Sequence, residues 1–428
     1  MFQEHSETSD KSTGVGSDYR PSSADSWLSP GNKVFAAEKL LLGRMLESLG
    51  NPPLKLVLWD GQEISPQGNS AAMCILIRDR GALMKLVANP EYWLGEMYTT
   101  GRIDVQGNLV DVLETIYRFL PRNNHGKKRH GLLTSLNIRE GNTPSIAVRN
   151  VHHHYDIGND FYKLWLDRRM VYTCAYFPDH SMDLEQAQIA KMDHICRKLR
   201  LKPGETVVEA GCGWGALALH MAKHYGARVE AYNISKEQLV YARDRVHSEG
   251  LDAQVRFIED DYRNIRGEFD AFVSVGMLEH VGMEHFHEFG DVMRRSLKDS
   301  GRGLIHCIGR DQPRPMNPWI ERHIFPGACP PSLSEMMQIF EPYEFSVLDV
   351  ENLRLHYAKT LEHWLQRFED SAERVAEMFD QAFVRTWRLY LAGSQAAFRS
   401  GDMQLFQVIF ARSGDNRIPH TRDYQYVS

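Results

Sequence analysis

The stretch Glu205-Thr-Val-Val-Glu-Ala-Gly-Cys-Gly-Trp-Gly-Ala216 decides the fold class of this chain. Its first half is an apolar run typical of a buried strand, and the glycines at 211, 213 and 215 predict a tight turn before the helix Leu217–Tyr225. Such a turn lets a ligand approach the backbone, while the amide end of the helix faces the ligand's polar groups. The stretch therefore predicts a site for a nucleotide-type cofactor.

Glu209 stands at the tip of this predicted strand. A carboxylate at that place disfavours a pyrophosphate and favours a cofactor that carries an amino group. S-adenosylmethionine meets this requirement. Because a lone G-x-G-x-G is weak evidence for a cofactor site, the interpretation depends on the surrounding pattern.

The surrounding pattern is α/β. A helix is predicted over Ser235–Glu249, and further strands are predicted over Arg228–Tyr232, Val255–Ile258 and Phe269–Val275. Apolar strands separated by helices indicate a parallel sheet covered on both faces, with ligands bound beyond the carboxyl ends of the strands. We therefore expect a Rossmann-like α/β domain with the loops 233–238, 260–262 and 276–280 on its ligand-binding edge.

The chain divides into four predicted segments. Residues 1–32 are rich in Ser, Asp, Gly and Pro and predict a disordered tail, because they offer little apolar surface to offset the entropy of ordering. Residues 33–120 predict a smaller α+β domain, residues 121–147 a basic linker, and residues 148–428 the catalytic domain. The elements expected in the smaller domain are helices at Ala36–Leu49, Gly81–Ala88 and Leu109–Phe119 and strands at Leu54–Trp59 and Ala72–Ile77.

The composition is typical of a soluble globular protein. Of the 428 residues, 43% are apolar and 25% charged, with a formal net charge of −6 and a pI near 6.3. The chain has no apolar run long enough to span a bilayer, and its polar start is unlike a signal peptide, so we expect a cytoplasmic location. The six cysteines form no C-x-x-C pair, so neither a zinc site nor a disulfide framework is indicated.

The basic linker has two interpretations. It is either a solvated connection or a segment attracted to anionic lipid, where each basic residue contributes about 1 kcal/mol. Nucleic acid is a poor candidate partner, because the chain is acidic overall and carries no recognised nucleic-acid-binding motif.

Several motifs occur in one order along the chain. They are His154–Tyr162 (HYDIGNDFY), Tyr172–Phe177 (YTCAYF), Gly211–Gly215 (GCGWG), Val275–Gly282 (VGMLEHVG) and His306–Gly309 (HCIG). Together they closely resemble the cyclopropane-fatty-acyl-phospholipid synthase family, which is related to the mycolic acid cyclopropane synthases. The resemblance implies a class I methyltransferase domain with a mainly parallel seven-stranded sheet. A weaker likeness at 95–98 and 101–113 implies a lipid-binding-like N-terminal domain.

The resemblance also implies a reaction. In this family a methylene group passes from S-adenosylmethionine to the cis double bond of an unsaturated phospholipid acyl chain, through a carbocation that a bound bicarbonate ion is understood to deprotonate. We therefore expect S-adenosylmethionine and bicarbonate in the site, a homodimer, and peripheral association with the inner face of the membrane.

The family's functional residues carry over to positions of this chain. The bicarbonate-binding set falls on Cys174, Glu279, His306, Ile308 and Tyr357. In this set the main-chain amides at 174 and 308 and the side chains of His306 and Tyr357 would donate to the anion. Glu279 would accept from the bicarbonate hydroxyl, because two anions in contact need a proton between them.

The cofactor-binding set carries over in the same way. Gln238 is expected to hold the ribose hydroxyls, because Glu230 sits too early for that role. Asn233 and Glu209 stand where relatives often have Thr and Asp, and both keep the hydrogen-bonding capacity. The set consists of Tyr172, Thr173, Glu209, Gly211, Cys212, Gly213, Trp214, Gly215, Asn233, Ser235, Gln238, Asp261 and Tyr262.

Taken one at a time, these residues have simpler interpretations. Cys174 alone fits a buried small apolar group, His306 a core histidine, and Tyr357 a packing residue. The run His152–His154 does not predict a metal site, because adjacent side chains do not face one centre.

Two further segments and three other functions remain open. Residues 319–331 are either a membrane contact or a lid over the site, and residues 360–399 predict two amphipathic helices over the acyl channel, before a strand at 404–410. The alternatives to cyclopropanation are a related enzyme that makes a methylene- or methyl-branched acyl chain, a non-catalytic lipid-binding protein and a small-molecule methyltransferase.

Overall fold

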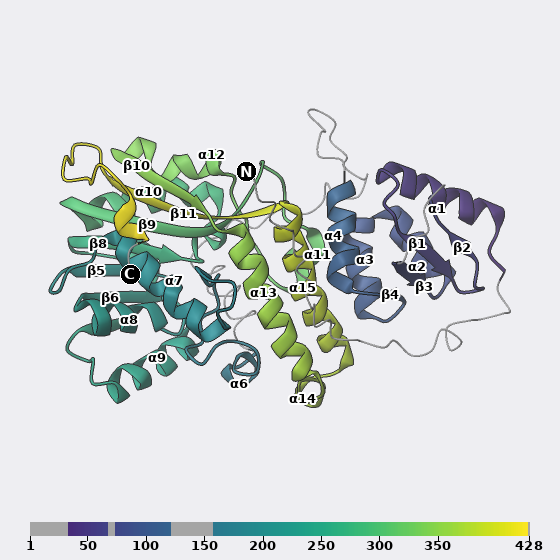
Figure 1. The fold of residues 1–428 in the computed structure, drawn as a ribbon, viewed down its shortest axis with the longest axis horizontal. Helices are drawn as coiled ribbons and strands as arrows, with labels where there is room; N and C mark the ends of the chain where they lie inside the picture. The colour runs from purple at the N-terminus through teal and green to yellow at the C-terminus, as the bar shows by residue number, and fades with distance from the viewer. Residues whose placement is uncertain (1–32, 67–72, 121–156, 427–428) are drawn as a thin grey trace, which may run out of the picture.

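The computed structural model describes residues 33–66, 73–120 and 157–426. The predicted tail at 1–32, the basic linker at 121–147 and the histidines at 152–154 lie outside these residues. The described chain forms a smaller N-terminal part with its own sheet and a larger part built on a second sheet (Figure 1).

The N-terminal part is the α+β arrangement that the sequence predicts. Its sheet has the order β2-β1-β3-β4, with β1 and β3 parallel and the other pairs antiparallel. Asp79, Asn89 and Asn108 cap α2, α3 and α4 through their side chains, which explains where these helices begin. The elements are α1 Ala36–Ser48, β1 Lys55–Leu58, β2 Glu63–Ile64, β3 Cys74–Ile77, α2 Arg80–Ala88, α3 Pro90–Thr99, β4 Ile103–Gln106 and α4 Leu109–Phe119.

The larger part contains a seven-stranded sheet with the order β10-β11-β9-β8-β5-β6-β7. The five strands from β9 to β7 pair in parallel, and β11 pairs antiparallel with both β9 and β10. The predicted mainly parallel seven-stranded sheet is therefore confirmed. The strands are β5 Thr206–Ala210, β6 Arg228–Asn233, β7 Val255–Glu259, β8 Phe269–Val275, β9 Leu297–Arg310, β10 Phe345–Asn352 and β11 Met403–Arg412.

Helices cover both faces of this sheet, as expected for parallel strands that are apolar on both sides. One core contains buried side chains of α7 Leu184–Leu199, α8 Ala216–Tyr225 and α9 Lys236–Ser248. The opposite core contains those of α10 Phe286–Ser296 and α12 Leu333–Met336. These two layers hold the carboxyl ends of β5, β6 and β8 at one common edge.

A third core, rich in aromatic residues, lies between the sheet and the N-terminal part. It contains α6 Asn159–Tyr162, α13 Arg354–Asp370, α14 Ala372–Met378 and α15 Gln381–Ser400 (Figure 1). The prediction of two helices over 360–399 is wrong, because the structure has three. The chain ends α13 at Ser371 and begins α15 at Asp380, whose carboxylate accepts a hydrogen bond from the Phe383 amide and so caps a new helix.

The two parts of the chain are joined through packed helices. In Figure 1, α3 and α4 lie beside α15 and α11 Pro318–His323. The Arg385 guanidinium on α15 donates to the carbonyls of Tyr98 at 2.6 Å and Ile103 at 3.0 Å. The N-terminal part is therefore fastened to the helices that border the site.

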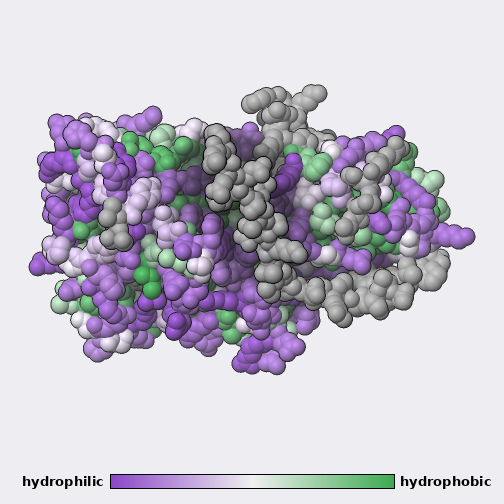
Figure 2. All heavy atoms as spheres, in the orientation of Figure 1, coloured by the Kyte–Doolittle hydropathy of each residue, from purple (hydrophilic) through white to green (hydrophobic). Residues whose placement is uncertain are grey.

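Hydrophilic residues dominate the surface drawn in Figure 2, with hydrophobic residues in separate small groups. Within the described residues, no helix combines the length and the apolar character that a bilayer crossing requires.

A glycine lies where a helix of the N-terminal part packs closely on α11. A Cβ built on Gly95 of α3 would lie 2.5 Å from the ring of Trp319, which is 3% exposed. We expect the free energy of unfolding of Gly95→Ala to be about 1–3 kcal/mol lower than that of Gly43→Ala. Alanine favours the helix at both positions, but only at position 95 does the added methyl group overpack a neighbouring side chain. Gly43 is the matched control, since it is also helical and its added Cβ meets no described atom within 4 Å. Urea unfolding measures the difference, and equal stability of the two variants would contradict the close packing of α3 on Trp319.

Candidate active site

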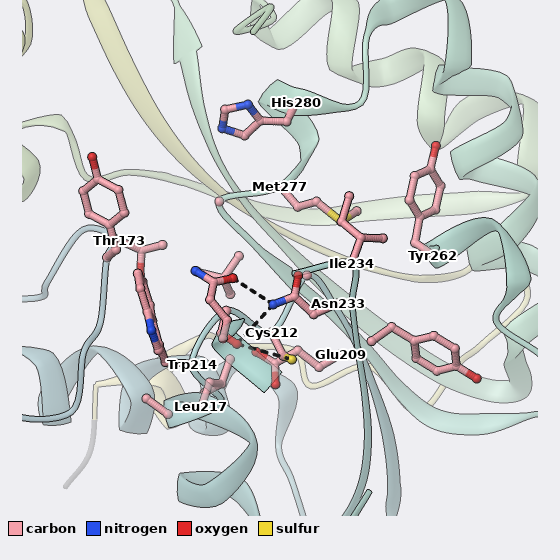
Figure 3. Close-up of a pocket in the computed structure, with 18 of the residues that line it drawn as sticks. Thr173, Glu209, Cys212, Trp214, Leu217, Asn233, Ile234, Tyr262, Met277 and His280 are labelled. Atoms are coloured by element: carbon pink, nitrogen blue, oxygen red, sulfur yellow. Dashed lines mark hydrogen bonds between the residues drawn. The ribbon is translucent and has the colours of Figure 1, made fainter. Parts of the chain in front are cut away.

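A cavity of about 190 Å³ opens at the carboxyl ends of β5, β6 and β8 (Figure 3). This is the edge at which the parallel sheet predicts ligand binding. The structure brings most of the predicted cofactor-binding set to this cavity. The residues of that set that line it are Tyr172, Thr173, Glu209, Gly211, Cys212, Gly213, Trp214, Asn233, Gln238, Asp261 and Tyr262.

The glycine loop is held open by its backbone conformation. Gly211, Gly213 and Gly215 have φ values of 83°, 53° and 78°, which only glycine adopts without strain. A Cβ on Gly213 would meet no described atom within 4 Å, so the backbone there borders open space. The loop therefore leaves room for a ligand against the main chain, as its sequence predicts.

Two members of the predicted set support the cavity without lining it. A Cβ on Gly215 would lie 2.4 Å from the Phe257 ring, so this glycine allows the loop to pack on β7. The Ser235 hydroxyl accepts a hydrogen bond from the Gln238 amide at 3.4 Å and caps α9. Sequence spacing alone does not separate such supporting positions from lining ones.

Glu209 is a buried carboxylate that faces the cavity. Its side chain is 2% exposed, and Oε2 has no hydrogen-bond partner among the described residues. Burial raises the pKa of this carboxyl group to about 8, against the opposing charge of Lys191. An uncompensated buried carboxylate is costly unless a cationic group reaches it, so the site fits a ligand with an amino group. S-adenosylmethionine carries such a group.

Lys191 also lines this cavity and is a residue that the sequence analysis missed. Its ammonium group donates to the Thr173 hydroxyl at 2.9 Å, and burial lowers its pKa to about 8. The available signal was a lysine on the buried face of an amphipathic helix, α7, which the sequence analysis did not predict. Lys191 thus holds Thr173 in place through this hydrogen bond, and its charge acts on the buried carboxylate of Glu209.

The ribose side of the predicted site is organised by Asn233. Its amide donates to the Gly213 carbonyl at 3.2 Å and to Gln238 Oε1 at 2.9 Å, so these side chains lie together (Figure 3). Glu230 forms an ion pair with Arg256 at 3.7 Å, consistent with the expectation that it serves elsewhere. The contact of Gln238 with ribose hydroxyls stays a prediction.

Asp261 and Tyr262 lie on the next loop of the same edge. The Asp261 carboxylate accepts from the Arg263 amide at 2.9 Å and pairs with its guanidinium at 3.0 Å. The Tyr262 hydroxyl is buried without a hydrogen-bond partner among the described residues, and burial raises its pKa. The loop therefore offers one unused donor close to the cavity.

A second, smaller cavity of about 30 Å³ adjoins the first. All five residues predicted to bind bicarbonate line it, namely Cys174, Glu279, His306, Ile308 and Tyr357. Five other residues, Tyr172, Thr173, Gly276, His280 and Phe325, line both cavities. Its volume exceeds the space that one water molecule needs, so it accommodates a small ion next to the cofactor cavity.

Glu279 is the only carboxylate among the residues that line the small cavity. It is 3% exposed, and its Oε1 accepts from the Ile308 amide at 3.3 Å, while Oε2 has no hydrogen-bond partner in the described chain. Burial raises its pKa to about 7, although the Cys307 thiol and neighbouring amides act in the opposite direction. The expected donation from the Ile308 amide to an anion is therefore replaced here by donation to Glu279.

The other three side chains of the predicted bicarbonate-binding set, those of Cys174, His306 and Tyr357, are buried. The Cys174 thiol donates to the Ala175 carbonyl at 3.1 Å, and burial raises its pKa, so the thiol stays protonated. His306 is 1% exposed, with Nε2 unpartnered in the described residues, and burial together with nearby lysines lowers its pKa well below the usual value. Tyr357 packs against Phe398 with ring centroids 4.6 Å apart.

The segment 319–331 forms a lid rather than an exposed apolar surface. Trp319 and Ile324 are 3% and 1% exposed, and Phe325 and Pro326 line the larger cavity. Of the two interpretations offered by the sequence, the structure therefore fits the lid, because these side chains face the protein interior. Behind the lid, the hydroxyl groups of Tyr172 and Tyr390 are hydrogen-bonded at 2.7 Å.

Comparison with known proteins identifies the family of this chain. A family model described as mycolic acid cyclopropane synthetase matches residues 143–408. The chain belongs to this family. A second family model, described as a domain of unknown function, matches residues 41–124.

Two curated relatives and one solved structure illustrate the similarity of this family member. A probable fatty acid methyltransferase of Pseudomonas putida is 35% identical, over 87% of this chain and 96% of its own length. The cyclopropane-fatty-acyl-phospholipid synthase of Escherichia coli is 42% identical, over 61% of this chain and 68% of its own length. The mycolic acid cyclopropane synthase CmaA1 in complex with SAH and CTAB aligns with a TM-score of 0.59 and 30% identity, over 61% of this chain and 97% of its own.

The family and the site together establish the coarse activity. The family match includes the seven-stranded sheet and the glycine loop at its edge, and the similar solved structure of CmaA1 contains SAH. The chain is therefore an S-adenosylmethionine-dependent methyltransferase of the cyclopropane synthase family.

Proposed function

We propose that this family member transfers a methylene group from S-adenosylmethionine to the cis double bond of an unsaturated phospholipid acyl chain and so forms a cyclopropane ring. The observation that carries the proposal is the junction of the two cavities. The larger one has a buried carboxylate suited to the amino group of the donor, and the smaller one has a buried carboxylate beside a buried imidazole.

The proposed reaction has two steps, methyl transfer and ring closure. The electron pair of the double bond forms a bond to the methyl carbon of the donor, the methyl–sulfur bond breaks, and S-adenosylhomocysteine leaves. The acyl chain then carries a positive charge on one of the two former alkene carbons. Loss of a proton from the new methyl group returns an electron pair that closes the three-membered ring, so the chain gains one CH₂ and one proton is released.

An isolated alkene is a weak nucleophile, so the residues around the junction must orient it and exclude water. Tyr172 and Phe325 line both cavities, and Trp214 lines the larger one. Aromatic faces stabilise an adjacent positive charge and offer no nucleophile to trap it. The lid residues Phe325 and Pro326 would close this space over the acyl chain.

The small cavity suits a bicarbonate ion. The bound ion would supply the base that accepts the proton from the transferred methyl group. His306 Nε2 is a buried donor without a partner in the described residues, and Glu279 Oε2 is a buried acceptor without one. One side chain would therefore donate to the ion and the other would accept from its hydroxyl, which is the pattern that the family resemblance predicts.

The partners proposed from the sequence remain part of this proposal. The partners are an unsaturated phospholipid in the membrane and a second copy of the chain in a homodimer. The proposal also includes peripheral association with the inner membrane face through the basic linker and a lipid-binding role for the N-terminal part.

A second candidate is supported by the comparison with Pseudomonas putida. That relative is described as a probable fatty acid methyltransferase, and it matches nearly the whole chain. The same cofactor cavity and the same cation would serve a reaction that ends in a methylene- or methyl-branched acyl chain. A non-catalytic lipid-binding protein is less well supported, because Glu279 and the glycine loop are both intact.

The product of the reaction separates the two candidates. Cells with monounsaturated membrane lipids that express this chain are expected to gain one CH₂ per modified acyl chain, with high-field ring protons in the proton NMR spectrum of the extracted lipids. Cells that express the Glu279→Gln variant are the control. The same mass gain with vinyl or branched-methyl signals would overturn ring closure and favour the second candidate, and no gain would overturn both.

A further inference from the structure

A buried chain of hydrogen bonds leads to His306 through two side chains that do not line the small cavity. The Lys198 ammonium donates to Gln407 Oε1 at 2.9 Å, and Gln407 Nε2 lies 3.0 Å from His306 Nδ1. The three side chains are at most 1% exposed. Lys198 and Gln407 line neither cavity, so these two residues are outside the machinery described above.

The direction of these bonds follows from the chemistry of the partners. An ammonium group only donates, so Lys198 selects the oxygen of the Gln407 amide. The amide nitrogen therefore faces His306 and donates to Nδ1, which must be the bare nitrogen of the ring. Because burial keeps His306 neutral, its single proton lies on Nε2.

Lys198, the first donor in this series of hydrogen bonds, is itself held in place. Lys198 and His194 both contact Glu351 Oε2, the histidine at 2.7 Å. Burial alone would raise the pKa of Glu351, but the bonds from His194 and Lys198 lower it to about 2. Burial lowers the pKa of Lys198, and the ionised Glu351 counteracts this effect. The carboxylate thus keeps Lys198 as the charged donor that the orientation of Gln407 requires.

The second ring nitrogen of His306, Nε2, indicates a function for this series of hydrogen bonds. His306 lines the small cavity, and its Nε2 has no hydrogen-bond partner within the described residues. A bare Nε2 would present a lone pair to an anion and repel it, whereas Nε2–H donates to it. The tautomer therefore decides whether the cavity accepts an anion.

We propose that Gln407 and Lys198 are positioning residues that keep the proton of His306 on Nε2, so that this nitrogen donates a hydrogen bond to the anion in the small cavity. The proposal rests on the proposed function in one respect, the presence of that anion. The fold supports the arrangement, because His306 on β9 and Gln407 on β11 stand directly opposite each other in the antiparallel ladder. Lys198 lies in the last turn of α7, which covers one face of the sheet, and its side chain reaches Gln407 from there.

The test compares Gln407→Leu with wild type in two measurements. The first is the bicarbonate concentration that gives half-maximal turnover, and the second is the ¹⁵N NMR spectrum of labelled histidine, with the His306 signals assigned by their loss in His306→Asn. We expect the variant to need about tenfold more bicarbonate, because a hydrogen bond to an ion is weakened. The wild-type spectrum should show a proton on Nε2 and a bare Nδ1, and the variant should lose this preference while it binds S-adenosylmethionine with unchanged affinity.

Gln395→Leu is the matched control, because Gln395 is also a buried glutamine but lies on α15, outside this chain of bonds. It should leave both measurements unchanged. A wild-type His306 with its proton on Nδ1 would overturn the proposal even if Gln407→Leu does not fold. A variant with wild-type bicarbonate dependence and tautomer would also overturn it. If wild-type turnover ignores bicarbonate, the proposed base is wrong, whereas the tautomer is still decided by the NMR measurement.

Discussion

Glu279→Gln is expected to lose turnover by on the order of 100-fold or more while it keeps its affinity for S-adenosylmethionine, because general-base assistance contributes typically 10²–10⁴-fold. Glu279 lines the small cavity, and it is absent from the lining of the cofactor cavity. Glutamine preserves the size of the side chain but replaces one carboxylate oxygen by a donor. It therefore cannot accept the bicarbonate hydroxyl in the way that the carboxylate does.

Cofactor binding and turnover of this variant are measured separately. Isothermal titration gives the affinity for S-adenosylmethionine, and release of S-adenosylhomocysteine in the presence of unsaturated phospholipid vesicles gives turnover. Glu341→Gln, at an exposed position, is the control for the substitution itself. Near-normal turnover of Glu279→Gln would remove this carboxylate from the mechanism, and a parallel loss of cofactor binding would show that it supports the larger cavity instead.

Glu209→Gln is expected to weaken S-adenosylmethionine binding by about 10- to 150-fold, the effect of a lost hydrogen bond to a charged group. The Glu209 carboxylate is buried, and one of its oxygens has no hydrogen-bond partner among the described residues. The neutral amide keeps the shape of the site but not the charge that attracts an ammonium group. S-adenosylhomocysteine carries the same amino group, so its affinity should fall by a similar factor in the same titration.

The same variant has an opposite effect on stability. Because the pKa of Glu209 is raised to about 8 in the folded chain, from an ordinary value of 4.5, the folded state binds its proton more tightly than the unfolded state does. This contribution to stability is fully present below pH 4.5 and is lost as the pH rises through 8. The cofactor-free Glu209→Gln protein should therefore lose less stability than wild type between pH 5 and about pH 9 in urea unfolding. A variant that is less stable than wild type at the high-pH end would show that Glu209 has a partner in the folded chain.

Much of the fold was predictable because its signals are local. The apolar run before the glycines at 211, 213 and 215 predicts β5 and the turn, and the apolar run 269–275 coincides with β8. The third helix in the 360–399 region was missed, because its start depends on a single cap at Asp380 within a continuous amphipathic pattern.

The candidate site was predictable as far as its motifs reach. All five residues predicted to bind bicarbonate line the small cavity, and eleven of the thirteen predicted to bind the cofactor line the larger one; Gly215 and Ser235 support the larger cavity without lining it. Motif spacing identifies residues near a ligand, but it does not tell a lining glycine from a packing one. That difference depends on what the neighbouring strand places against the loop, here the Phe257 ring.

The sequence by itself determined the class of the sheet, the glycine loop and the identity of the residues that can take part in binding or catalysis. The spacing of apolar residues, the residues of a turn and the type of each side chain are properties of short stretches of chain. Only the tertiary structure decided how these residues are paired. Lys191 contacts Thr173 across 18 residues, the Ile308 amide reaches Glu279 across 29, and Gln407 faces His306 across 101. Such contacts arise when helices and strands pack, and burial then raises the pKa of carboxyl groups such as those of Glu209 and Glu279.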